Sequence, residues 1–252
     1  SHNFQNLLDL LGGSGYEDID PFLTGDARQS DLNNPNRVVG VGDEFGYNYN
    51  LFADVLDGFV QSRFSYNKVD FYAAVNYSRS EYQREGLYRN GNYSDNSFGK
   101  GDKKEFNNFG FKGGATYKIT GRHMIDFNAL YMTKAPTLRN SFPNARLNNK
   151  FTEGLESESI YGGDISYIIR APKLKARITG YYSKISDATD ISFYFAEGLG
   201  ILSEAERGVN NSNANAFVSE TVTGLDKVNM GGELGIEYKV TPTITATAAA
   251  AY

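Results

Sequence analysis

The sequence of 252 residues contains no cysteine and no tryptophan, and only 6 prolines. Without cysteine, disulfide bonds and thiolate chemistry are excluded. The absence of tryptophan argues mildly against an aromatic belt at a membrane interface, although tyrosine fills the same role because its ring is apolar and its hydroxyl stays hydrated. Long apolar runs are absent too, since nothing approaches the roughly 18 apolar residues that a transmembrane helix needs.

Basic residues are not in excess. Lys and Arg number 25 against 30 Asp and Glu, which gives a net charge of −5. A surface that binds nucleic acid needs a basic face, so we expect no nucleic-acid partner. No signal peptide opens the chain at Ser1, and we expect the chain to begin within a longer protein.

Residues typical of sheets and turns are abundant. The chain contains 18 Tyr, 17 Phe and 27 Gly, and aromatic residues make up 14% of it. Aromatic residues favour strands, whereas glycine supplies turns and bulges. From residue 46 to residue 252, apolar residues recur with a period of two. This pattern predicts an all-β fold, and we interpret it as about eight strands of an antiparallel transmembrane β-barrel with long extracellular loops.

Residues 1–45 do not alternate in this way. Phe4, Leu7, Leu8 and Leu11 fall at helical spacing, and residues typical of loops follow them. We therefore predict that residues 1–45 form an extracellular loop region that contains one short helix.

The first predicted strand, 46–66, has a change of phase. Tyr49, Leu51 and Val55 are apolar at odd positions, whereas Val60 and Phe64 are apolar at even positions. A shift of one residue moves every side chain to the other face. We predict a bulge at Asp57-Gly58 within one long strand, with a hairpin turn at the same place as the alternative.

The connections between predicted strands alternate in length. Short connections fall at 67–68, 120–122, 171–172 and 241–242, and long ones at 83–104, 135–157 and 188–225. Bacterial outer-membrane barrels have this asymmetry, with brief periplasmic turns and long extracellular loops. The pattern therefore favours a barrel in the bacterial outer membrane.

Two other folds remain as alternatives. A soluble carbohydrate-binding β-sandwich also alternates apolar and polar residues, because one face of each sheet packs on the core. A small outer-membrane barrel, closed at eight strands and acting as a passive pore or adhesin, requires residues 1–45 and the last strand to complete the cylinder. Strands longer than the usual five or six residues, and tyrosines that close several apolar faces, favour the membrane over the sandwich.

Four segments resemble TonB-dependent outer-membrane receptors of the Bacteroidetes. They are Tyr66-Asn67-Lys68-Val69-Asp70-Phe71-Tyr72, Tyr82-Gln83-Arg84-Glu85-Gly86-Leu87-Tyr88, Lys134-Ala135-Pro136-Thr137-Leu138-Arg139-Asn140 and Gly231-Gly232-Glu233-Leu234-Gly235-Ile236-Glu237-Tyr238. The resemblance implies a barrel of about 22 strands with a plugged lumen. It also implies uptake of a scarce, bulky nutrient (a glycan, a peptide, a siderophore or a cobalamin-like molecule), with the TonB complex and, in some relatives, a surface lipoprotein as partners.

The chain departs from that family in its extent. It has room for only eight strands, and it contains no plug domain and no TonB-contacting segment. It stops at Tyr252 on an apolar strand whose edge is unpaired, which a membrane does not tolerate. We therefore expect a fragment of a transporter, with the residues that couple energy outside it.

No catalytic constellation is evident, and we expect no enzyme activity, no cofactor and no metal. The histidines are His2, near the chain start, and His123, beside a short turn, and neither is placed for a catalytic triad. Acidic residues gather near the start of the chain, at Glu17, Asp18, Asp20, Asp26 and Asp31. They lack EF-hand spacing, so we interpret them as a solvated loop rather than a calcium site.

Aromatic residues in the predicted long loops are the candidates for ligand binding: Tyr88, Tyr93, Phe193 and Tyr194, with Phe98 and Phe195 beside them. Such side chains stack on a sugar or a hydrophobic ligand at an extracellular mouth. The alternative is that they pack loop against loop, since long loops need a small core of their own.

Overall fold

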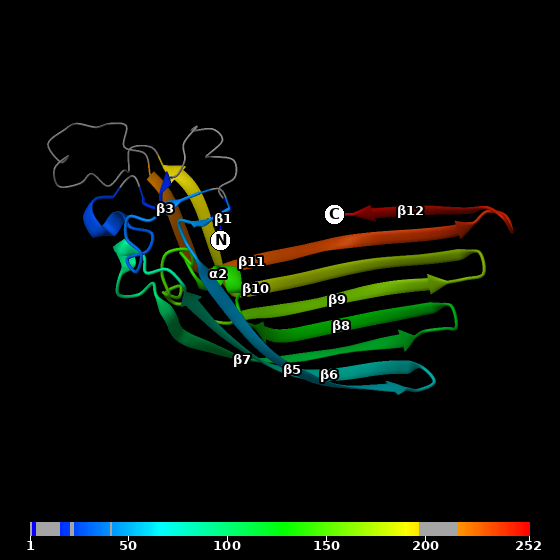
Figure 1. Ribbon diagram of the computed structural model, residues 1–252. Coiled ribbons are helices and arrows are strands. Elements are labelled where there is room, and N and C mark those ends of the chain that lie inside the picture. Colours follow the sequence, from blue (N-terminus) through cyan, green and yellow to red (C-terminus); the bar gives the residue numbers. More distant parts are fainter. Residues whose placement is uncertain (1, 4–15, 21–22, 41, 197–215) are drawn as a thin grey trace.

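The chain folds into one large antiparallel sheet, with shorter elements gathered at one end of it. The computed structural model describes residues 2–3, 16–20, 23–40, 42–196 and 216–252. Eight strands form the sheet, and each pairs with its neighbours in sequence (Figure 1). They are β5 (Tyr49–Ser65), β6 (Val69–Gly86), β7 (Gly99–Lys118), β8 (His123–Lys134), β9 (Glu158–Arg170), β10 (Leu174–Ala196), β11 (Ala216–Lys239) and β12 (Thr245–Ala251). The predicted eight-stranded antiparallel fold is confirmed.

The connections alternate in length, as predicted. Short turns at 66–68, 119–122, 171–173 and 240–244 lie at one end of the sheet, which we call the turn end (Figure 1). The longer connections 87–98 and 135–157 lie at the opposite end, which we call the loop end. The loops predicted at 83–104 and 188–225 are shorter than expected, because β6 and β7 extend into the first and β10 and β11 into the second. The connection 197–215 lies outside the described residues.

The remaining elements are short. They are β1 (His2–Asn3), paired with β4 (Glu44–Phe45); β2 (Tyr16–Glu17), paired with β3 (Val38–Val39); the 3-10 turns η1 (Gly25–Arg28) and η2 (Gly91–Tyr93); and the helix α2 (Leu138–Ser141). In the described part of the chain, no helix is long and apolar enough to span a membrane. The short helix predicted around Phe4 and Leu11 lies outside the described residues.

The predicted bulge at Asp57-Gly58 is wrong. Strand β5 pairs with β6 residue for residue, from Tyr49 opposite Gly86 to Ser65 opposite Asp70, without a shift in register. The apolar residues change phase because the two halves of the strand have different surroundings. Near the loop end, the side that carries Tyr49 faces the packed connections, whereas near the turn end the opposite side is the apolar one.

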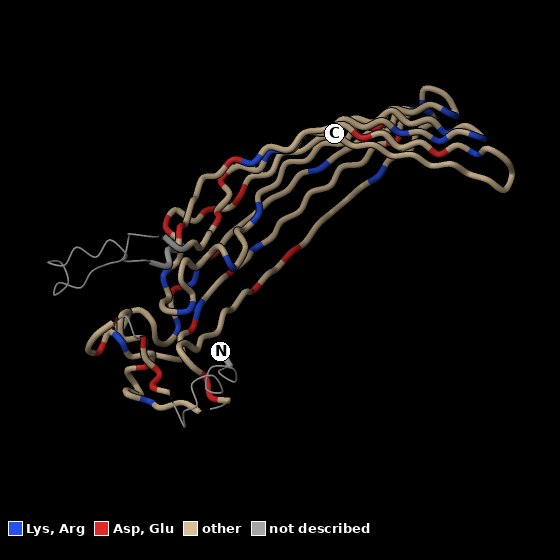
Figure 2. Tube along the Cα trace, turned by 90° about the horizontal axis from the view of Figure 1, so that it is seen from above, with Lys and Arg blue, Asp and Glu red and all other residues tan. Residues whose placement is uncertain are grey.

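The sheet has two distinct faces. We call inner the face that segment 135–157 covers at the loop end, and outer the opposite face. On the inner face, Tyr82 and Phe106 form a buried cluster with Ala135 and Leu155, and the Tyr82 hydroxyl donates to the Pro136 carbonyl oxygen over 3.0 Å. The loop end therefore has its own small core. Elsewhere the sheet is a single layer that curves along its length (Figure 2).

Candidate ligand-binding site

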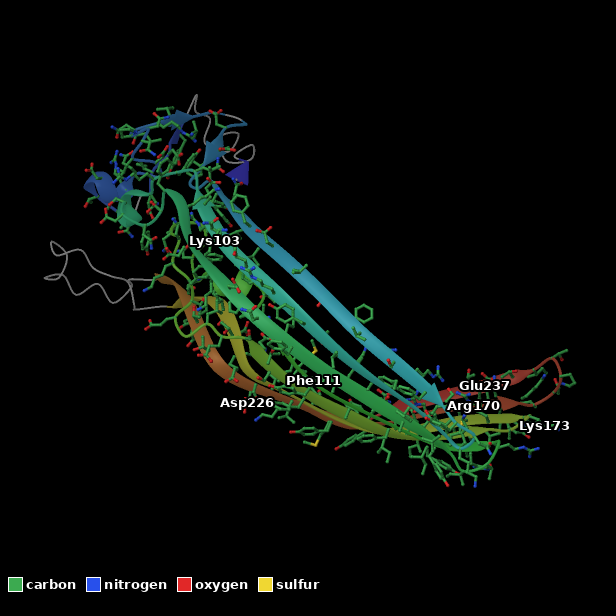
Figure 3. The ribbon with its side chains drawn as sticks, turned by 90° about the horizontal axis from the view of Figure 1, so that it is seen from below. Lys103, Phe111, Arg170, Lys173, Asp226 and Glu237 are labelled. Carbon is green, nitrogen blue, oxygen red and sulfur yellow. The ribbon has the colours of Figure 1, made fainter. Side chains whose placement is uncertain are left out.

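The outer face is apolar across the sheet and lies open. Phe127 is 51% exposed and Met230 is 69% exposed. Large apolar side chains continue this surface on every strand from β6 to β11, among them Phe71, Val75, Phe111, Ile165, Ile178 and Leu234 (Figure 3). These are the apolar faces predicted from the period of two. Their exposure means that the described part of the chain supplies no second layer to cover them.

This arrangement decides between the alternative folds. In a β-sandwich the apolar face is buried against a second sheet, but here the eight strands lie in one sheet. The soluble sandwich is therefore wrong. The barrel closed at eight strands is wrong as well, because β5 pairs with β6 alone and β12 with β11 alone among the described strands.

Aromatic residues border the apolar surface on both sides. Nearer the turn end they are Tyr117, Tyr167 and Tyr238, and nearer the loop end they are Tyr77, Phe109, Tyr131, Tyr161 and Tyr182. Ring centroids in the second row lie 5.1 Å apart for the Tyr77–Phe109 and Tyr131–Tyr161 pairs. Beyond that row the outer face carries ion pairs such as Arg79 with Glu105.

The inner face is polar at the same level. The Tyr72 hydroxyl donates to Asn128 Oδ1 over 3.1 Å, and Asn128 Nδ2 donates to Asp164 Oδ1 over 3.2 Å. On the neighbouring strands Arg177 Nη2 donates to Ser166 Oγ over 3.0 Å. The sheet thus presents polar groups on one side and apolar groups on the other, as the wall of a membrane barrel does.

A buried arginine organises the loop end. Arg84 projects inward from β6 with 1% of its surface exposed. Its Nε donates to the Ala145 carbonyl over 2.6 Å, and Nη1 donates to the Ser97 carbonyl over 3.0 Å and to Asn149 Oδ1. Its guanidinium carbon lies 5.1 Å from the centre of the Tyr49 ring. Burial lowers the pKa of Arg84 to about 10, so the group is still protonated at neutral pH.

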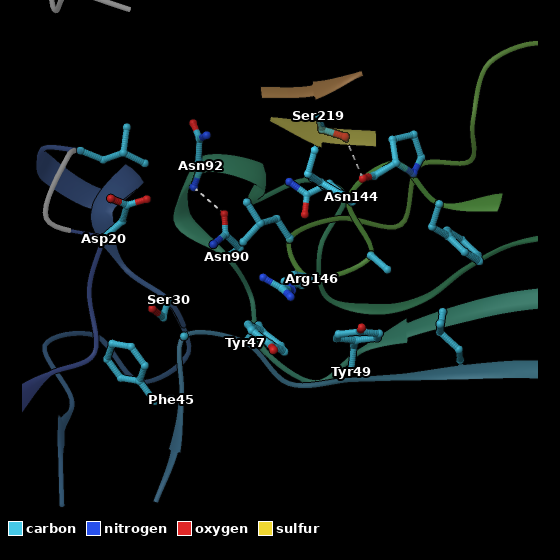
Figure 4. A pocket seen from close by; sticks show the side chains of 18 of the residues that line it. Asp20, Ser30, Phe45, Tyr47, Tyr49, Asn90, Asn92, Asn144, Arg146 and Ser219 are labelled. Atoms are coloured by element: carbon cyan, nitrogen blue, oxygen red, sulfur yellow. Dashed lines mark hydrogen bonds between the residues drawn. The ribbon is translucent and has the colours of Figure 1, made fainter. Parts of the chain in front are cut away.

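A cavity of about 1000 Å³ opens at the loop end (Figure 4). Its described lining comes from residues 19–51, from 90 and 92 in the next connection, from 138–147, and from β10 and β11 through Ile191, Phe193 and Ser219. Tyr47 and Tyr49 stand beside Arg146, whose guanidinium carbon lies 5.3 Å from the centre of the Tyr47 ring. The wall is mainly apolar and aromatic.

Three arginines line the cavity. Arg28 forms an ion pair with Glu17, with Nη2 3.2 Å from Oε2. Arg139 and Arg146 are exposed, and neither forms an ion pair with any carboxylate in the described ranges. An arginine guanidinium holds a carboxylate or phosphate through paired hydrogen bonds. The cavity therefore has the means to hold a ligand that has both an apolar body and an anionic group.

Of the four aromatic residues predicted to bind ligand, one lines the cavity. Phe193 does so from β10, and Tyr194, the next residue, points to the opposite face because side chains alternate along a strand. Tyr88 is buried, with the Arg37 guanidinium carbon 5.1 Å from its ring centre. Tyr93 lies in η2 next to Asn92, which lines the cavity, but is itself not part of the lining. Phe195 lies outside the described side chains.

Several cavity residues were not predicted. Tyr49 was predicted to lie on an apolar strand face. Phe45, Arg139 and Arg146 were not predicted to bind a ligand, although they line the cavity. No spacing in the sequence signals them, because the cavity brings together segments from distant parts of the chain. The one local clue is that Tyr47 and Tyr49 are apolar at odd positions, whereas Val60 and Phe64, nearer the turn end of β5, are apolar at even positions.

The other groups considered from sequence lie apart from the cavity or already have partners. The His123 Nδ1 atom is 2.7 Å from the Tyr167 hydroxyl at the turn end. In the acidic cluster, Asp18 forms an ion pair with Arg37, with Oδ2 3.1 Å from Nη2. Within the described ranges, no group of three or more His, Cys, Asp or Glu residues is arranged to hold a metal ion.

The similarities to known proteins are structural. No protein-family model and no curated protein sequence matches the chain. The structure is similar to the iron transporter FrpB (F3-3 variant) from Neisseria meningitidis, with a TM-score of 0.56 and 14% identity, covering 82% of this chain and 26% of that one. It is also similar to the copper transporter OprC, with a TM-score of 0.56 and 13% identity, covering 86% of this chain and 32% of that one.

These similarities concern the fold. The chain spans between a quarter and a third of the length of the two transporters. The eight-stranded sheet corresponds to part of the barrel of TonB-dependent outer-membrane receptors. At 13–14% identity, the bound metal in the names of those proteins says nothing about the ligand of this one.

Proposed function

We propose that this chain is part of the barrel of a TonB-dependent transporter in the bacterial outer membrane, which takes up a bulky nutrient. The observation that carries the proposal is the two-sided sheet. Its outer face is apolar and open, its inner face is polar, and its fold is similar to part of two transporters, each with a TM-score of 0.56. Resemblance to receptors of the Bacteroidetes type supports the proposal through the four segments quoted above.

The dimensions of the outer face support a position in the membrane. On two adjacent strands the apolar belt spans nine residues, from Val69 to Tyr77 on β6 and from Phe109 to Tyr117 on β7. A tilted transmembrane strand needs about 9–11 residues. Aromatic rows at both borders fit the two interfaces of a bilayer, where amphipathic rings are enriched. The turn end then faces the periplasm and the loop end the exterior.

The open edges of the sheet support a larger barrel. Backbone groups on the free edges of β5 and β12 would be unsatisfied in lipid, at a cost of several kcal/mol each in hydrocarbon. Further strands must therefore pair with both edges if the sheet spans a membrane. Residues 46–252 then form one arc of a barrel that encloses a lumen, and residues 1–45 form an extracellular loop region.

The cavity at the loop end is the proposed site of ligand capture. Its exposed position, its aromatic and apolar wall, and Arg139 and Arg146, which form no ion pair with the described carboxylates, suit a bulky ligand with an anionic group. Release into the periplasm would need a plug domain and the TonB complex, and a surface lipoprotein is a further partner that the family resemblance implies.

The proposed capture site is tested by replacing Arg139 and Arg146 together. We expect the double variant Arg139→Gln/Arg146→Gln to bind its ligand at least about tenfold more weakly, because hydrogen bonds to charged groups are each worth about 1.5–3 kcal/mol. The ligand is first identified by mass spectrometry of small molecules that purify with the full-length protein. Affinity is then measured by calorimetry.

The matched control for this test is Lys150→Gln, which removes an exposed cation of the same loop outside the cavity lining. The control is expected to keep the affinity of the unmodified protein. If the double variant binds the ligand as tightly as the unmodified protein does, the cavity is not the site of ligand capture. Uptake of the ligand that persists in cells without a TonB complex would contradict energised transport.

A further inference from the structure

Charge is distributed unevenly between the two ends of the sheet. The whole chain has a net charge of −5. The four turns at 66–68, 119–122, 171–173 and 240–244 nevertheless contain Lys68, Arg122 and Lys173 and not one Asp or Glu. The turn end is therefore cationic in a chain whose net charge is acidic (Figure 2).

The strand ends beside these turns add to the same charge. Strands β7, β9 and β11 each run toward the turn end, and their last residues are Lys118, Arg170 and Lys239. Figure 3 shows Arg170 and Lys173 together at this end of the sheet. A cation thus stands at or beside every turn from β5 to β12.

Most of these cations have no acidic partner. Lys118 is the exception, because its Nζ atom lies 2.8 Å from Asp70 Oδ1 and forms an ion pair with it. In the described part of the chain, no ion pair involves the other five: Lys68, Arg122, Arg170, Lys173 and Lys239. All five are exposed. Their charge is therefore available to an external anion.

The turn end has a second close ion pair, since Lys175 Nζ lies 2.8 Å from Glu237 Oε1, but its cations outnumber its carboxylates. The opposite border of the apolar belt differs in this balance of charge. There Arg79 pairs with Glu105, and Lys184 Nζ lies 2.7 Å from Asp226 Oδ2. Charges of both signs cancel on that border, whereas at the turn end one sign predominates. A general need for polar residues at the ends of strands would not produce this difference.

Aromatic residues fix the level of the unpaired cations relative to the apolar belt. Tyr117, Tyr167 and Tyr238 lie on the outer face within a few residues of the turns. Tyrosine at the border of a transmembrane barrel lies at the level of the lipid headgroups. Cations a few residues further out are then at the level of the lipid phosphates.

We infer that the turn end of the sheet binds the phosphate groups of anionic phospholipids in the leaflet that it borders. This inference rests on the proposed position of the sheet in a membrane. Lys68, Arg122 and Lys173 are its central residues, since they project from the turns themselves. Each basic residue near an anionic bilayer strengthens binding roughly fivefold at low ionic strength, and added salt screens the effect.

The test compares two lipids on the full-length protein, purified from outer membranes in detergent. Phosphatidylglycerol and phosphatidylcholine with the same acyl chains are titrated in, and bound lipid is counted by native mass spectrometry. We expect tighter binding of phosphatidylglycerol, and a loss on the order of 100-fold in the triple variant Lys68→Gln/Arg122→Gln/Lys173→Gln. The control variant Lys134→Gln/Lys150→Gln/Lys227→Gln removes three cations nearer the loop end and is expected to keep the preference.

Two results would overturn the inference: no preference for phosphatidylglycerol in the unmodified protein, or the same preference in the triple variant. With no lipid preference, an acidic periplasmic protein becomes the partner to examine at the turn end. Membrane fractionation of the same cells separates this failure from failure of the proposed function. A protein that fractionates with the outer membrane but shows no lipid preference contradicts the lipid inference alone.

Discussion

Replacing Arg84 by methionine is expected to open the loop end, and the cost should be on the order of 3 kcal/mol. The guanidinium joins three parts of the chain: β6, the connection at Ser97, and the segment at Ala145 and Asn149. Methionine fills part of the volume but leaves these acceptors buried without a donor. Because the arginine has no acidic partner in the described ranges, its loss leaves no unpaired charge behind.

The expected measurement is the rate of tryptic cleavage after Arg146 in the full-length protein. A loss of about 3 kcal/mol in local stability raises the cleavage rate on the order of 100-fold when cleavage follows local opening. The variant Arg84→Lys separates charge from geometry, since lysine keeps the charge but cannot reach several acceptors as a planar fork does. We expect it to behave more like methionine than like arginine.

The control for this prediction is Arg79→Met on the outer face of the same strand. Arg79 is exposed and pairs with Glu105. Exposed ion pairs contribute about 0–1 kcal/mol, so the cleavage rate should change by less than about fivefold. If Arg79→Met and Arg84→Met accelerate cleavage equally, Arg84 does not hold the loop end together.

An arginine on the outer face of β8 is expected to interfere with assembly of the barrel. Phe127→Arg places a charge in the middle of the apolar belt, between Ile125 and Tyr131. On the lipid face of a barrel, an arginine at the bilayer midplane costs about 2–4 kcal/mol. We therefore expect much less folded protein in the outer membrane, measured as heat-modifiable protein on gels.

Leu130→Arg is the matched control, because it adds the same side chain to the same strand on the inner face. Leu130 is 39% exposed on that side and lies opposite Lys112 and Gly162 on the adjacent strands, so an arginine there can stay hydrated. Folded protein is expected at close to the unmodified level. Equal losses for both variants would mean that the two faces of the sheet do not differ as proposed.

The sequence predicted the sheet because its information is local and periodic. Alternation along β8, with Ile125, Phe127 and Tyr131 on one side and Asp126 and Asn128 on the other, follows from geometry that every strand obeys. The bulge at Asp57-Gly58 was predicted wrongly for a related reason. A change of phase has two physical origins, a break in the strand or a change in what each face contacts, and the pattern alone does not separate them.

The cavity was largely out of reach of sequence reasoning. Phe193 was predicted to bind ligand because it belongs to a run of three aromatic residues. Side chains alternate along β10, so Phe193 points into the cavity and Tyr194 points to the opposite face. Arg146 and Tyr47 are 99 positions apart in the sequence, and folding alone brings them together. Such contacts have no period and no fixed spacing from which to predict them.

The structure explains which side chains are needed in one of the four segments that resemble the receptor family. In Tyr82-Gln83-Arg84-Glu85-Gly86-Leu87-Tyr88, the even positions point inward and are buried. Tyr82 and Arg84 pack under the connections, and a Cβ atom at Gly86 would lie 1.6 Å from the Ser97 carbonyl oxygen. The packing of the loop end therefore requires these side chains, whatever the origin of the sequence pattern.

The central claim is that the apolar outer face of this sheet lies in the outer membrane, and the most direct measurement is fractionation of cells that produce the full-length protein. We predict that the protein sediments with the outer membrane, resists extraction by high salt, and enters solution only with detergent. If the protein instead stays in the aqueous fraction as a monodisperse species without detergent, something other than lipid covers Phe127 and its neighbours. The membrane assignment and the proposed transport function would then both be wrong.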